Sequence, residues 1–221
     1  MLFVWYKVSF DEKWSHGSAV CETVYFFVEF VCVFPWKCVS LNNQNREKIM
    51  DGILRKLPIG IQTFEKLREG DYLYVDKTAL VWRIASTETP YFLSRPRRFG
   101  KSLLLSTFEA YFEGKKELFE GLAIADMEKE WKTYPVFHLD LNAEKYDSPQ
   151  ALVEILSRQL TQWELKYGKG EDEETLSGRF AGVIRRACEQ SGRGVVVLVD
   201  EYDKPLLQAL DDGTLLDDYR K

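Results

Sequence analysis

Three consecutive residues, Gly100, Lys101 and Ser102, carry the groups that a protein needs to hold a phosphate chain. A glycine lets the backbone pass close to phosphate, a lysine reaches the terminal phosphate oxygens, and a serine hydroxyl can bind Mg²⁺. Backbone N–H groups at the start of a helix add further donors for an anion. The triplet matches the end of the phosphate-binding motif known as the P-loop or Walker A. Because such a triplet arises by chance in about one chain of this length in ten, its structural context decides its meaning.

The residues just before the triplet depart from the usual motif. Arg95 stands where the pattern has its first glycine, and Pro96 lacks a backbone N–H donor. Arg97 and Arg98 offset this loss, because together with Arg95 and Lys101 they place four cations within seven residues. Both arginines are therefore candidates for phosphate contact. The same loop also fits a solvated basic turn, or a surface that contacts nucleic acid or a protein partner.

Two carboxylates, Asp200 and Glu201, follow the apolar run VVVLV. A buried strand that ends in acidic residues presents them at the carboxyl edge of a parallel sheet, where ligands bind. Asp200 would hold Mg²⁺, directly or through water, and Glu201 would orient and polarise the water that attacks ATP. Asp203 ranks below them, as a supporting carboxylate or a helix cap. The alternative is that Asp200 and Glu201 are both merely exposed acidic residues at a strand end, and the triplet upstream favours the catalytic interpretation.

Strands and helices are predicted to alternate around these two motifs. Ser148 is predicted to cap a helix that begins with Pro149 and ends at Gly168. The β-branched run at 195–199 lacks the polar alternation of a half-exposed strand, which favours a parallel sheet covered on both faces. The pattern predicts helices at 65–69, 78–86, 101–113, 149–167 and 179–190, and strands at 91–94, 136–141 and 195–199. The fold class is therefore α/β.

The composition excludes several classes of protein. The 221 residues are 45% hydrophobic and 29% charged with a net charge of −5, which is unlike a disordered, fibrous or nucleic-acid-coating chain. The apolar stretch at 23–36 contains Glu29 and Pro35, so it is a poor membrane span and a poor signal peptide. The four cysteines lack the spacing of a metal knuckle. These features predict a reduced, cytoplasmic chain without a membrane partner, and His138 is predicted to be a structural strand residue.

Residues 1–48 differ in composition from the remainder. They contain three of the four cysteines and three of the six tryptophans, and their five basic and five acidic residues cancel. We expect an appended segment of uncertain structure at 1–48, with Met50 as the natural start, followed by one domain at 49–221. The competing interpretation is a β-hairpin or an interfacial anchor, because 23–34 has the composition of a strand.

Four segments together resemble the amino-terminal part of the bacterial AAA-ATPase-like family over residues 56–221. They are LPIGIQTFEKLREGDYLYVDKTALV, YFLSRPRRFGKSLLLSTFEAYFEGKKELFEGL, VFHLDL and VVVLVDEYDKPLL. The resemblance implies that Arg98 to Ser102, Phe99 included, bind phosphate and that Asp200 and Glu201 serve as the Walker B acidic residues. The glycine-poor loop is a trait of this family. ATP and Mg²⁺ are the implied cofactors.

The resemblance also implies that Tyr74, Asp76 and Lys77 belong to the site region, near the base of the bound nucleotide. It further implies a P-loop NTPase-type three-layer α/β/α fold with a parallel sheet, incomplete at its C-terminal side. The P-loop strand, which is the predicted strand at 91–94 before the triplet, would then lack the two strands that normally flank it. This would leave a gap on each side of it. We therefore expect an ATP-binding protein whose Mg²⁺-dependent ATP hydrolysis is impaired by truncation. The alternatives are a non-catalytic fragment that binds nucleotide, nucleic acid or a partner, and a small-molecule phosphotransferase.

Overall fold

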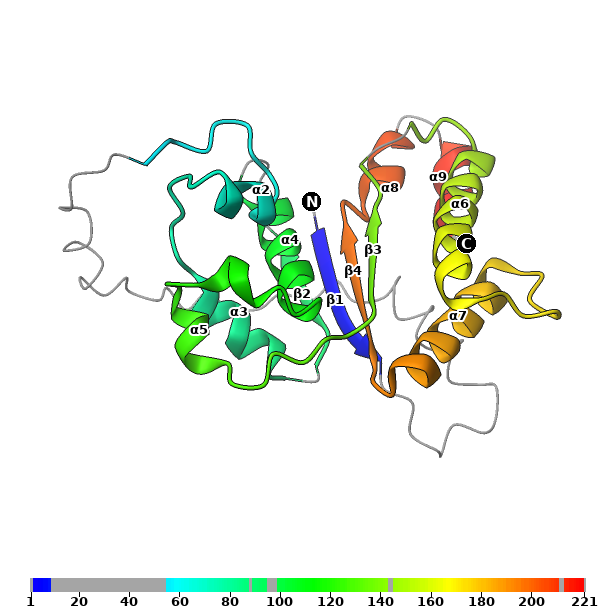
Figure 1. The fold of residues 1–221 in the computed structure, drawn as a ribbon. Helices are drawn as coiled ribbons and strands as arrows, with labels where there is room; N and C mark the ends of the chain where they lie inside the picture. Colours follow the sequence, from blue (N-terminus) through cyan, green and yellow to red (C-terminus); the bar gives the residue numbers. More distant parts are fainter. Residues whose placement is uncertain are drawn as a thin grey trace.

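The computed structural model describes residues 2–8, 55–87, 89–94, 99–142, 145–210 and 213–220. Figure 1 shows a central sheet with helices on both of its sides. In chain order the elements are β1 (Leu2–Val8), α2 (Phe64–Glu69), α3 (Thr78–Ala85), β2 (Tyr91–Ser94), α4 (Lys101–Phe112), the 3-10 helix η3 (Lys116–Phe119), α5 (Ala123–Met127), β3 (Val136–Asp140), α6 (Pro149–Tyr167), α7 (Leu176–Ser191), β4 (Val195–Asp200), α8 (Lys204–Gln208) and α9 (Gly213–Arg220).

The four strands form one sheet in the order β2-β1-β4-β3. β3 and β4 are parallel, whereas β1 is antiparallel to both β2 and β4. β2, β4 and β3 therefore run in the same direction, and their carboxyl ends lie at one edge of the sheet. The α/β class is confirmed. The prediction of a parallel sheet holds for β3 and β4 but is wrong for the whole sheet, because an antiparallel strand lies at its centre.

Side chains of β4 alternate between apolar clusters on the two faces of the sheet. Val196 and Leu198 pack in one cluster with Phe108 of α4, and Val195 packs in another with Ala187 of α7. All five side chains are fully buried. The continuous apolar run therefore occurs because β4 is covered on both faces, as its composition predicted.

Local signals placed the longest helix correctly. The Ser148 hydroxyl accepts a hydrogen bond from the N–H of Ala151, and Pro149 is the first residue of α6. Gly168 ends this helix in a positive-φ conformation (φ 91°), which disfavours a residue with a Cβ. Such caps act over three or four residues, so they can be recognised in the sequence without knowledge of the fold.

The predicted gap beside the P-loop strand is filled on one side. β1 pairs with β2 from Leu2–Ser94 to Trp5–Tyr91, and it also pairs with β4. Because β2 is the outer strand of the sheet, the expectation that it loses both neighbours is wrong on its inner side. Residues 9–48 of the predicted appendage lie outside the described residues. Among the described helices, none has the length and apolar character to cross a membrane.

Candidate functional site

The Gly-Lys-Ser triplet lies where the chain turns into α4, as the sequence predicted. Gly100 adopts the left-handed conformation (φ 72°, ψ 27°) and is the N-cap of the helix. A Cβ at this position would meet no atom within 4 Å, so the backbone angle rather than crowding requires glycine. Because the N-cap residue is glycine, it has no side chain to bond the first N–H groups of the helix. The first turn of α4 can therefore present backbone N–H groups to an anion.

Ser102 and Asp200 are in direct contact although 98 residues separate them in the chain. The Ser102 hydroxyl donates a 2.7 Å hydrogen bond to Oδ2 of Asp200. Asp200 is the last residue of β4 and only 4% exposed. Its other carboxylate oxygen, Oδ1, is buried without a hydrogen-bond partner among the described residues. A buried carboxylate oxygen without a donor is costly unless a cation compensates its charge.

This pair fits one edge of a Mg²⁺ site. A hydroxyl and a carboxylate supply the hard oxygen ligands that Mg²⁺ prefers, and the ion usually takes its remaining ligands from water and substrate phosphates. Within the described ranges, no group of three or more His, Cys, Asp or Glu side chains is placed to hold a metal by itself. The residues therefore suit an ion that arrives with a phosphate ligand.

Lys101 and Glu201 carry opposite charges next to this pair. Both side chains are buried, with 5% of Lys101 and 7% of Glu201 exposed. Burial raises the pKa of Glu201, the negative charge of Asp200 raises it further, and the positive charge of Lys101 lowers it. Glu201 also has a left-handed backbone (φ 58°), which is uncommon for a residue other than glycine and is often found at functional sites.

The other predicted site residues have different outcomes. Asp203 occupies the N-cap position of α8 without capping it through its side chain, and its charge raises the pKa of Glu201. Phe99 is 62% exposed. Arg97 and Arg98 lie outside the described residues, so their phosphate contacts stay a prediction.

The motif LYVDKT has a structural role that the resemblance did not indicate. Asp76 accepts hydrogen bonds from the N–H groups of Thr78 and Ala123, at 2.8 Å each. Thr78 in turn accepts a hydrogen bond from the N–H of Ile124 through its hydroxyl. The Tyr74 ring packs on Phe64, and burial raises the pKa of Tyr74 to about 12. The hydrogen bonds join the starts of α3 and α5, and the ring contact holds Tyr74 against Phe64 of α2.

Two polar residues of β3 lie near the site: Asp140, which sequence reasoning missed, and His138, which it predicted as a strand residue. Asp140 pairs with Asp200 across the parallel strands, so the two carboxylates end neighbouring strands at the same edge. His138 lies two residues earlier, and its Nδ1 is 3.0 Å from Oε2 of Glu109 on α4. The rule that parallel strands end at one edge could have identified Asp140. The contact between His138 and Glu109 depends on how α4 packs on the sheet.

The contact between Glu109 and His138 should make stability depend on pH. Burial lowers the pKa of His138, but the hydrogen bond and charge of Glu109 outweigh it, so the net pKa is raised. A raised folded-state pKa contributes stability that is complete below about pH 6.5 and is lost as the pH rises through the folded value. Glu109→Gln should therefore destabilise the protein more at about pH 5.5 than at about pH 8 in urea unfolding.

The matched control is Glu117→Gln, which removes an exposed carboxylate from η3. Its effect on the free energy of unfolding should be small and independent of pH in this range. An equal loss of stability at every pH for Glu109→Gln would contradict a role for the charge of His138.

Comparison with known proteins identifies the family of this chain. The chain belongs to the family described as "Predicted AAA-ATPase", whose sequence model matches residues 58–221. This match confirms the resemblance drawn from the motifs.

One curated relative, described as "Uncharacterized protein in vnfD 5'region" from Azotobacter chroococcum mcd 1, is 45% identical over 157 residues. The aligned region covers 71% of this chain and 30% of that protein, so the chain spans less than a third of its relative's length. No solved structure matches the chain.

Proposed function

We propose that this chain binds Mg²⁺-ATP at the carboxyl edge of its sheet, in the manner of a P-loop NTPase with three α/β/α layers. The observation that carries the proposal is the 2.7 Å hydrogen bond between Ser102 and Asp200. It joins the two halves of a nucleotide site that lie 98 residues apart in the chain. The membership in a family described as a predicted ATPase supports ATP as the nucleotide.

Each residue of the site has a distinct part in binding. Gly100 turns the chain so that the first N–H groups of α4 face the phosphates, and Lys101 neutralises the β and γ oxygens. Ser102 and Asp200 would hold Mg²⁺, which would neutralise charge on the phosphate oxygens when bound. Arg97 and Arg98 would add positive charge from the loop that precedes the helix.

Glu201 would support hydrolysis of the bound ATP. The water oxygen would bond to the γ-phosphorus as the bond from that phosphorus to the bridging oxygen of ADP breaks, and the water's proton would pass to Glu201. A base works best when its pKa approaches the working pH. Burial and the charge of Asp200 raise the pKa of Glu201 in that direction. The products are ADP and phosphate.

Titration of the full chain with ATP, with and without Mg²⁺, tests the proposal. The unaltered chain should bind ATP more tightly when Mg²⁺ is present. Ser102→Ala removes one of the two proposed Mg²⁺ ligands, so it should weaken binding in Mg²⁺ about tenfold or more and change binding without Mg²⁺ much less.

Ser177→Ala, at an exposed position of α7, serves as the matched control and should bind like the unaltered chain. The proposal fails if the unaltered chain binds no ATP, or if Ser102→Ala has the same Mg²⁺ dependence as the control.

A further inference from the structure

The centre of the sheet is formed by the first residues of the chain. β1 pairs with β2 through four register pairs, from Leu2–Ser94 to Trp5–Tyr91. It pairs with β4 through six, from Phe3–Asp200 to Val8–Val195. Every ladder contact of β2 in the described sheet is therefore with β1, and β2 has no direct pairing with β4.

β1 fills the position between β2 and β4. Neighbouring strands are about 4.8 Å apart, so with β1 between them β2 and β4 lie about 10 Å from each other, too far to pair directly. Val195, Val196 and Leu198 of β4 are fully buried. Without a neighbour, each buried backbone N–H or C=O on this side of β4 would cost about 1–3 kcal/mol.

The sequence of β1 suits this position. Leu2–Val8 reads LFVWYKV, in which every residue except Lys7 is apolar or aromatic. A strand inside a sheet that is covered on both faces needs such a continuous apolar run, whereas a strand at a solvated edge does not. The residue types of β1 and the burial of β4 thus indicate the same central placement.

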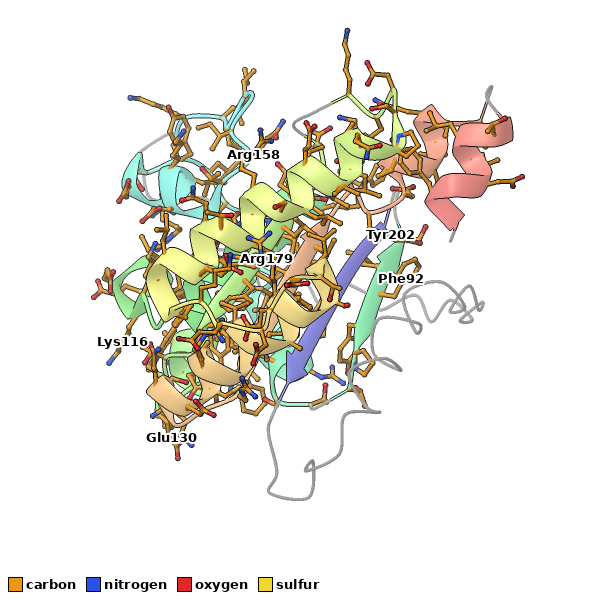
Figure 2. The ribbon with its side chains drawn as sticks, turned by 90° about the vertical axis from the view of Figure 1, so that its right-hand side faces the viewer. Phe92, Lys116, Glu130, Arg158, Arg179 and Tyr202 are labelled. Atoms are coloured by element: carbon orange, nitrogen blue, oxygen red, sulfur yellow. The ribbon has the colours of Figure 1, made fainter. Side chains whose placement is uncertain are left out.

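The amino-terminal end of β1 lies at the candidate site. Leu2 pairs with Ser94, the last residue of β2, and Phe3 pairs with Asp200, the last residue of β4. Two consecutive residues of β1 therefore meet both strand ends that lead into the site. Figure 2 shows Phe92 of β2 and Tyr202 beyond β4 close together at this end of the sheet, and their ring centroids are 5.9 Å apart.

The two ends of the phosphate loop are held in different ways. At its carboxyl end, α4 shares a buried apolar cluster with β4 that includes Phe108 and Leu198. At its amino end, Ser94 belongs to β2, which gains its backbone pairing from β1. Loss of β1 would thus leave Ser94, the last residue of β2, less restrained relative to the start of α4. Binding of phosphate would then require more ordering of the loop, which lowers affinity.

We propose that Leu2–Val8 is a bridging strand that holds β2 beside β4, and that ATP affinity depends on it. The second part rests on the proposed function, whereas the first does not. The bridging strand positions Ser94, the last residue of β2, relative to Asp200, the last residue of β4.

Disulfide cross-linking in the full chain tests the placement without any nucleotide. Val4 pairs with Phe92 in the β1–β2 ladder, and directly opposed residues of an antiparallel pair have Cα atoms about 4.5–5.5 Å apart, within the range of a disulfide. Val4→Cys with Phe92→Cys should therefore cross-link within one chain on mild oxidation. The background carries alanine or serine in place of the native cysteines Cys21, Cys32, Cys38 and Cys188.

Val4→Cys with Leu93→Cys is the matched control, because successive residues of β2 point to opposite faces of the sheet. This pair should not cross-link. The linked peptides are identified by mass spectrometry, and gel filtration distinguishes a link within one chain from a link between two copies. Absence of the Val4–Phe92 link, or a link that forms between copies, would overturn the proposal.

The dependence of ATP binding on the strand is tested by Trp5→Pro. Trp5 pairs with both β2 and β4, and proline cannot donate a ladder hydrogen bond inside a sheet. The variant should bind ATP at least about tenfold more weakly while its circular dichroism retains the helical signal. Unchanged affinity would overturn the dependence.

A second measurement covers the case in which Trp5→Pro does not fold. The oxidised Val4–Phe92 pair keeps β1 in place, so it should bind ATP as tightly as the unaltered chain, and loss of binding on oxidation would overturn the proposal. If the cross-link forms within one chain but the unaltered chain binds no ATP, the bridging strand is supported and the proposed function is overturned.

Discussion

Replacing Lys101 with alanine should weaken ATP binding by about tenfold to a hundredfold, because a charge-assisted hydrogen bond to phosphate contributes about 1.5–3 kcal/mol. The side chain of Lys101 is only 5% exposed at the start of α4, beside the acidic pair that ends β4. Because this position is closed to bulk solvent, solvent cannot supply the positive charge that Lys101→Ala removes. Equilibrium titration with ATP in the presence of Mg²⁺ measures the loss.

Two further variants make the test of Lys101 specific. Lys116→Ala removes an exposed lysine from η3, outside the triplet and outside α4, and should bind ATP like the unaltered protein. Lys101→Arg keeps the charge but replaces a compact ammonium with a larger planar group, so we expect intermediate affinity. Equal affinities of Lys101→Ala and Lys116→Ala would show that phosphate does not bind at this helix start.

Glu201→Gln should lower the rate of ATP hydrolysis by about a hundredfold or more while ATP binding remains, because a general base contributes about 10²–10⁴-fold to the rate. Glutamine has nearly the same shape as glutamate but cannot accept the proton of the attacking water. Phosphate release from the full chain measures hydrolysis, and ATP titration measures binding. Turnover at the unaltered rate would remove Glu201 from the reaction.

The same substitution should increase stability at neutral pH. The folded-state pKa of Glu201 is raised by burial and by Asp200. A raised pKa means that the stabilising contribution is complete below the unfolded value, about pH 4, and is lost as the pH rises through the folded value. Glu201→Gln should therefore raise the free energy of unfolding at about pH 7 and give no such gain at about pH 4. Destabilisation at neutral pH would contradict this assignment.

A gain in stability with a loss of turnover is the pattern expected of a residue retained for function. Glu201 combines an unfavourable buried charge with a left-handed backbone. Packing alone favours neither feature, since an uncharged residue and a glycine would relieve them. Their coincidence directly after Asp200 supports the functional interpretation of the acidic pair.

Much of the secondary structure follows from the sequence alone. The strand at 91–94 has the predicted bounds, and the strand at 195–199 extends by one residue to Asp200. The helix at 149–167 is also as predicted, because its cap and its ending glycine act locally. Both halves of the candidate site were identified by residue type and spacing, and the structure brings Ser102 and Asp200 into contact.

Other features depend on contacts that no local pattern encodes. The pairing of Asp140 with Asp200 requires the register of β3 on β4. The contact of His138 with Glu109 requires α4 to cross β3 at one particular position. The carboxylate of Asp76 accepts hydrogen bonds from the first N–H groups of α3 and α5, at Thr78 and Ala123, and only the fold brings these two helix starts together.

The sequence by itself determined the alternation of strands and helices and the chemical groups available for phosphate and Mg²⁺. Helix caps, apolar periodicity and strand composition act over a few residues, so they can be recognised before folding is known. The tertiary structure decided which distant segments meet. It placed Leu2–Val8 between two strands that begin about 90 and 190 residues later, and it aligned Ser102 with Asp200. Strand register and helix packing depend on burial across the whole domain, which no short segment specifies.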